Sequence, residues 1–236
     1  MQIRVTINLF IFAPNTKYIS MIKDEWYTNK TWNGKIDSKF EDFFKRARGD
    51  SNKADILQIQ GCHLLSNSNK NIQEVGEALL TRLCEDYPAE HSSIIIAQEK
   101  LGDYFLYQHD FTQAAHYFKL VIQYCKDQKS ISGTSGLAEI KLADSLVKTK
   151  QPALLDQAYT LVVDFPTNLC KLIDQKFYHA DLAARICDKL DKKEEAIKFA
   201  ISAIEIAKSV KPNFGNKKNN APSAAQLKLL KEIIAS

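Results

Sequence analysis

The chain has 236 residues, of which 45% are hydrophobic and 25% are charged, and its 32 basic and 28 acidic residues leave a net charge of +4. This balance is that of an ordinary soluble globular protein, and so small an excess of positive charge does not indicate a nucleic-acid-binding surface. Because it contains only 8 glycines and 6 prolines, the chain favours long helices over a β-sandwich with many tight turns.

Residues 1–20 carry an apolar stretch from Val5 to Ala13 that is far too short to span a bilayer. The stretch has one preceding basic residue, Arg4, and no clear small-residue cleavage site, so it does not match a signal peptide. We interpret residues 1–20 as an irregular, strand-like or disordered extension, or as an artefact of start-codon choice with Met21 as the natural start. No membrane insertion is expected.

Residues 21–53 are expected to form an aromatic segment followed by a helix. In SKFEDFFKRAR the phenylalanines, including Phe40 and Phe44, recur at helical spacing. Ser38, with Glu41 three residues later, predicts a capping box at the start of this helix. The basic residues at its end suit the negative end of the helix dipole.

A small residue recurs at intervals of 41 residues in the four stretches that follow: Gly61, Gly102, Ala143 and Ala184. An apolar residue comes three positions after each one, namely Leu64, Phe105, Leu146 and Cys187. Residues three apart share a helix face, so each small residue is expected to admit a neighbouring helix beside the apolar side chain. The spacing predicts four helical hairpins, each beginning with one of these helices.

Each first helix is followed by a polar turn and a second amphipathic helix. Three of these second helices are expected to begin at an N-cap residue with an acid or amide three positions later: Asn71 with Glu74, Asp110 with Gln113, and Asp191 with Glu194. Pro152 suits the first position of the remaining second helix. Pro88 and Pro166 are expected to mark the ends of two of them, because proline cannot continue a helix.

Residues 98–121 resemble a tetratricopeptide repeat (TPR), whose pattern runs Leu-Gly-x-x-Tyr, then Ala-x-x-x-Phe, then Pro. Five residues fall on the pattern: Leu101, Gly102, Phe105, Ala114 and Phe118. The last hairpin has small residues at the equivalent positions: Ala183, Ala184, Ala196, Ala200 and Ala203. The resemblance implies an all-α fold, a right-handed α-solenoid of about four TPR-like helical hairpins, over residues 54–210.

Two features depart from the TPR pattern. The period is 41 residues, whereas a TPR has about 34, and the proline expected after the second hairpin is absent. A HEAT-like helical array, which shares the longer period, is the alternative fold. The segments WYTNKTWNGK and FFKRAR also resemble the start of uncharacterised bacterial TPR proteins, which implies a bacterial source and supports Met21 as the start.

Residues 211–222 form a polar linker containing glycine, proline and asparagine, and residues 223–236 are expected to form a final helix. Ser223 with Gln226 predicts its capping box, and leucines and isoleucines at helical spacing predict an apolar face. We expect this helix to fold back as a cap on the last repeat, because terminal repeats must hide an apolar face. The alternative is that it docks on a second copy and forms a homodimer.

The TPR resemblance also implies a concave groove lined by the first helices. The residues one step after the small positions are expected to face it: Cys62, Asp103, Asp144 and Arg185. The neighbouring candidates lie four residues before or after that set: Gln58, Glu99, Tyr107, Lys148, Asp181 and Lys189. This mixed charge suits a peptide or protein segment better than phosphates, so no nucleic-acid partner is expected.

No catalytic motif occurs: the chain has no Gly-rich phosphate loop, no His-Glu-x-x-His and no Gly-x-Ser-x-Gly. The chain has five cysteines, an odd number, and no Cys-x-x-Cys motif. This pattern indicates the reduced thiols of a cytoplasmic protein, and no metal site is expected. We therefore expect no cofactor and a non-catalytic scaffold or adaptor that binds a protein or peptide. A regulatory protein that senses a peptide or signal through a bound partner is the main alternative; an enzyme or a nucleic-acid binder is the weakest.

Overall fold

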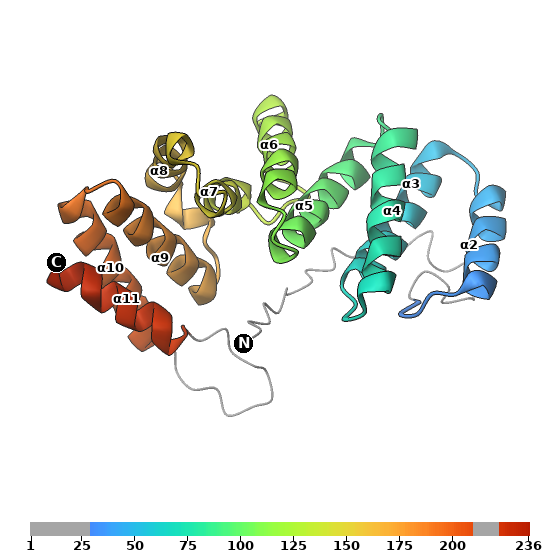
Figure 1. Cartoon of the computed structure of the whole chain (residues 1–236). Helices are drawn as coiled ribbons and strands as arrows, with labels where there is room; N and C mark the ends of the chain where they lie inside the picture. The colour runs from blue at the N-terminus through green and yellow to red at the C-terminus, as the bar shows by residue number, and fades with distance from the viewer. Residues whose placement is uncertain (1–28, 210–221) are drawn as a thin grey trace. The chain divides into compact units, whose positions relative to one another are not determined.

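The computed structural model describes residues 29–209 and 222–236, so the expected extension at residues 1–20 and nearly all of the expected linker lie outside it. The described residues contain ten α-helices and no strand, which confirms the all-α class (Figure 1). The helices are α2 (Gly34–Arg46), α3 (Asp50–Leu65), α4 (Lys70–Asp86), α5 (His91–Tyr107), α6 (Phe111–Gln128), α7 (Ala138–Lys148), α8 (Leu155–Val163), α9 (Ile173–Lys189), α10 (Lys193–Ser209) and α11 (Ala224–Ala235).

The chain divides into two compact units, whose described parts are residues 29–138 and residues 139–209 with 222–236. In the first unit α3 packs on α4, α5 packs on α6, and α5 also contacts both α3 and α4. The core of this unit contains Leu57, Leu80 and Leu101, all fully buried. Neighbouring antiparallel pairs therefore share one apolar interior, as stacked hairpins require.

The small residues at the repeat positions permit close approach within two of these pairs. A Cβ placed on Gly102 would lie 2.7 Å from Cε1 of Phe118, and one on Gly61 would lie 2.6 Å from Cδ2 of Leu80. Gly76 of α4 is tighter still, since a Cβ there would lie 2.5 Å from the backbone nitrogen of Leu65. The predicted role of Gly61 and Gly102 is therefore confirmed by the packing that surrounds them.

In the second unit α8 packs on α9, α9 packs on α10, and α11 lies against both α9 and α10 (Figure 1). Alanines dominate the interior between α9 and α10, and α11 contributes Leu230 and Ile233 to it. The C-terminal helix thus covers the apolar face of the last pair within the same chain, as the sequence predicted.

The capping predictions had mixed outcomes. Asp110 caps α6, because its Oδ1 accepts a hydrogen bond from the backbone N–H of Gln113 at 3.0 Å. Ser223 forms the predicted capping box with Gln226 at the start of α11. Tyr87 is the C-cap of α4, so that helix ends just before Pro88 as predicted.

Three predicted N-caps were wrong. Ser38 lies inside α2, whose cap is Asn33, because the Asn33 side chain accepts from two backbone amides at the start of the helix. Asn71 lies one residue inside α4, whose cap is Asn69. Asp191 has a φ of 55° and lies in the turn before α10, so it terminates α9 instead of starting α10.

Candidate functional site

All ten predicted groove residues lie on α3, α5, α7 and α9, the helices expected to come first in each hairpin, but they differ widely in exposure. Tyr107, Lys148 and Lys189 are exposed, and Gln58, Asp103 and Arg185 are partly exposed. The remaining four are buried: Cys62, Glu99, Asp144 and Asp181. The expectation that these four line an open groove is therefore not met, and each has an internal reason for its burial.

Glu99 of α5 is covered by the loop that follows α6. The backbone N–H of Ser135 donates to Glu99 Oε2 at 2.8 Å, and the hydroxyl of Ser135 donates to Oε1. Cys62 of α3 accepts from the Gln58 amide at 3.7 Å, and burial raises the pKa of its thiol. Both side chains act inside the first unit and are not presented to a partner.

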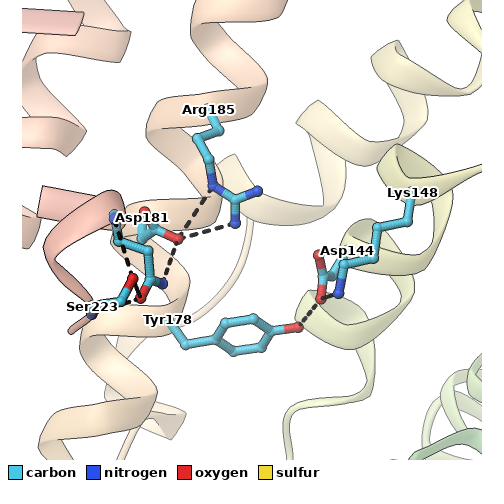
Figure 2. Close-up of polar contacts among 7 residues, drawn as sticks. Asp144, Lys148, Tyr178, Asp181, Arg185 and Ser223 are labelled. Carbon is cyan, nitrogen blue, oxygen red and sulfur yellow. Dashed lines mark hydrogen bonds and ion pairs between the residues drawn. The ribbon is translucent and has the colours of Figure 1, made fainter. Parts of the chain in front are cut away.

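Asp144 of α7 joins two helices of the second unit. Its Oδ2 accepts from the hydroxyl of Tyr178 of α9 at 2.8 Å and from the ammonium of Lys148 at 2.8 Å (Figure 2). The side chain of Asp144 is 5% exposed, whereas that of Lys148 is 41% exposed. The carboxylate of Asp144 is therefore buried, whereas the ammonium group that it binds lies closer to the solvent.

Asp181 of α9 repeats this arrangement. Both Nε and Nη2 of Arg185 donate to Asp181 Oδ2, at 3.2 and 3.0 Å (Figure 2). The side chain of Asp181 is 2% exposed and that of Arg185 is 27% exposed. Its other oxygen, Oδ1, is buried and has no hydrogen-bond partner.

We call Lys148, Arg185 and Lys189 of the second unit the cationic stripe. Arg185 and Lys189 are four residues apart on α9, and the bond between Tyr178 and Asp144 links α9 to α7, which carries Lys148. Lys148 and Lys189 are 41 residues apart, the spacing on which the predicted hairpins rest. The buried carboxylates each bind one of the cations, so the outward surface of the stripe carries ammonium and guanidinium groups. Of the four predicted acidic residues, Glu99, Asp144 and Asp181 are buried, and Asp103 is partly exposed.

Sequence reasoning missed Tyr178 and Gln226 as members of this polar cluster. Tyr178 precedes Asp181 by three residues and so lies on the same face of α9, a signal that the spacing contained. Gln226 of α11 lies within 3.5 Å of Asp181 Oδ2, across 45 residues of sequence. No local pattern indicates that contact, because it depends on where α11 folds back.

Among the described residues, no group of three or more His, Cys, Asp and Glu side chains is placed to hold a metal ion. None of the helices in the described ranges is long and apolar enough to cross a membrane. Comparison with known proteins found no family model, no curated protein and no solved structure that matches the chain.

Proposed function

We propose that the protein is a non-catalytic cytoplasmic scaffold or adaptor that binds a peptide or protein segment on the first-helix face of a right-handed TPR-like array. The observation that carries this proposal is the cationic stripe of Lys148, Arg185 and Lys189, held over buried carboxylates. The five free cysteines support a reducing compartment.

The stripe favours an acidic segment. A lysine ammonium has three N–H donors and an arginine guanidinium has five, so these side chains can donate charge-assisted hydrogen bonds to Asp or Glu of a ligand. The ion pairs with Asp144 and Asp181 hold Lys148 and Arg185 in place before binding, which lowers the entropy that a ligand must overcome. Exposed charges of this kind affect specificity and association rate more than affinity.

Random peptides displayed on phage, selected against the full chain at low ionic strength, test this function. We expect Asp and Glu to be enriched in the selected peptides. The enrichment should disappear when Lys148, Arg185 and Lys189 are all replaced by Glu. A control variant makes the same change at three exposed lysines of α10, Lys193, Lys198 and Lys208, and should retain the selected peptides. Equal loss in both variants would show only a general effect of net charge and would contradict the proposal.

A further inference from the structure

α11 packs on one face of the α9–α10 pair, and the core that the three helices share is rich in alanine. Ala180, Ala184, Ala196, Ala200 and Ala203 belong to this core, together with the larger Phe177. On this face α11 buries two large side chains, Leu230 and Ile233. The face therefore accepts a helix with apolar residues at suitable spacing. We refer to this face of α9 and α10 as the α11 seat.

The polar edge of the α11 seat is poorly matched to its occupant. Gln226 uses its Oε1 in the capping box, where it accepts from both the backbone N–H and the hydroxyl of Ser223 at 3.0 Å. Its amide nitrogen therefore reaches Asp181 Oδ2 only at 3.5 Å, the limit of a hydrogen bond. Asp181 Oδ1 stays buried without a donor, and a buried carboxylate oxygen without a hydrogen bond is unfavourable.

We propose that the α11 seat is a docking site for an amphipathic helix of a partner protein, and that α11 is its exchangeable occupant. The partner helix carries Arg or Lys at the place of Gln226, a leucine-like residue four positions later and an isoleucine-like residue seven positions later. Its cation donates to Asp181 Oδ1, while Arg185 keeps Oδ2. This site adjoins the cationic stripe, because Asp181 binds Arg185, but it takes a different ligand. It goes beyond the proposed function and does not rest on it.

The partner must compete with a helix that belongs to the same chain. Residues 210–221 connect α10 to α11, and a short connection of this kind gives a local concentration on the order of millimolar. An unconnected copy of α11 therefore displaces α11 poorly. A helix that donates a hydrogen bond to Asp181 Oδ1 has an interaction that α11 lacks. This additional bond favours the partner helix over α11.

Fluorescence anisotropy with the full chain and three labelled peptides tests the proposal. The first peptide has the sequence of residues 222–236, the second carries Gln226→Arg, and the third carries Gln226→Arg with Leu230→Glu. We expect the second peptide to bind roughly tenfold more tightly than the first, as a charge-assisted bond to a buried carboxylate predicts, and the third not to bind.

The preference for arginine should vanish in the Asp181→Asn chain. It should persist in the Asp144→Asn chain, a matched change at a buried carboxylate that binds Tyr178 and Lys148 instead. Equal binding of the first two peptides, or binding of neither, overturns the proposal. A chain that is dimeric in light scattering and becomes monomeric with peptide also overturns it, because the occupant is then the α11 of a second copy.

Hydrogen exchange on the intact chain decides the matter if the Asp181→Asn chain does not fold. Gln226→Arg and Gln226→Met both remove the capping box, but only the arginine offers a donor to Asp181. We expect the amides of α11 to exchange roughly tenfold more slowly in Gln226→Arg than in Gln226→Met. Equal exchange in the two variants overturns the role given to Asp181.

Discussion

The hydroxyl of Tyr178 lies 2.8 Å from Asp144 Oδ2 and joins α9 to α7, although the two residues are 34 positions apart in the sequence. Asp144 is buried, so its carboxylate depends on this hydroxyl and on the Lys148 ammonium for its hydrogen bonds. Removing a donor from a buried carboxylate lowers the free energy of unfolding, because the oxygen is left without a hydrogen bond. The stability of the second unit should therefore depend on this contact.

We expect Tyr178→Phe to lower the free energy of unfolding by about 1.5–3 kcal/mol, the usual value for a hydrogen bond to a charged group. Urea denaturation of Tyr178→Phe, Asp144→Asn and the double variant measures the coupling between the two residues. Lys148→Met removes the other donor to Asp144, which is more exposed, and should lower the free energy of unfolding by less than Tyr178→Phe does. Additive effects of Tyr178→Phe and Asp144→Asn would contradict the stabilising role of this bond.

Gly102→Ala should destabilise the first unit even though alanine favours helices. Its Cβ would lie 2.7 Å from the Phe118 ring, and overpacking of this kind costs about 1–3 kcal/mol. The control is Gly34→Ala in α2, where a Cβ would meet nothing within 4 Å and the better helix propensity should stabilise by about 0.5–1 kcal/mol. Thermal unfolding of both variants gives the comparison, and a Gly102→Ala protein as stable as the parent would refute the close packing.

Arg82 of α4 holds α2 in place through two interactions. Its Nη1 lies 2.6 Å from Glu41 Oε1, and its Cζ lies 4.3 Å from the centroid of the Phe44 ring. About a third of each charged side chain is exposed (34% and 32%), so solvent weakens the ion pair. We expect Arg82→Gln to cost about 1–2 kcal/mol in chemical denaturation.

Exposed Arg48 provides the matched control, since Arg48→Gln removes the same charge and should change stability by less than about 0.5 kcal/mol. Added salt should reduce the difference in unfolding free energy between Arg82→Gln and the parent only in part. Salt screens the ion pair with Glu41, but the contact with the Phe44 ring also excludes water and should persist. Equal effects of the two substitutions would show that net charge, and not the position of Arg82, is responsible.

Two thiols should resist alkylation at neutral pH. Burial raises the pKa of Cys187 to about 11, with a smaller contribution from the Glu195 carboxylate, and burial with Glu85 raises the pKa of Cys84 to about 11. At neutral pH their thiolate fraction is about two orders of magnitude below that of an ordinary cysteine. The folded state favours the neutral thiols, so their contribution to stability is present below the ordinary thiol pKa and is lost as the pH rises toward 11.

Alkylation at a series of pH values, followed by mass spectrometry, measures the reactivity of each thiol. Labelling of Cys187 and Cys84 should rise steeply as the pH approaches 11. Glu195→Gln should shift the Cys187 profile to lower pH, whereas Glu194→Gln, at the exposed neighbouring residue, should leave it unchanged. A Cys187 profile that does not respond to Glu195→Gln would remove the electrostatic part of the explanation.

The helical class and the positions of most helices could be predicted from the sequence because both depend on local periodicity. The 41-residue spacing placed Gly102 opposite a neighbouring helix, and the structure confirms that Phe118 fills that space. Helix starts were less predictable. Ser38 carries a capping pattern, but Asn33 lies earlier and binds two amides, so the helix starts there instead.

The sequence by itself placed the ten candidate residues in helices, because helical periodicity is local, and the resemblance to a TPR supplied the expectation that they face a groove. Only the tertiary structure decided which of those residues meet solvent. Glu99 is buried by Ser135, 36 residues away, and Asp181 lies against Gln226, 45 residues away. Exposure depends on which distant segment returns to cover a helix, and the periodicity of that helix carries no information about the segment.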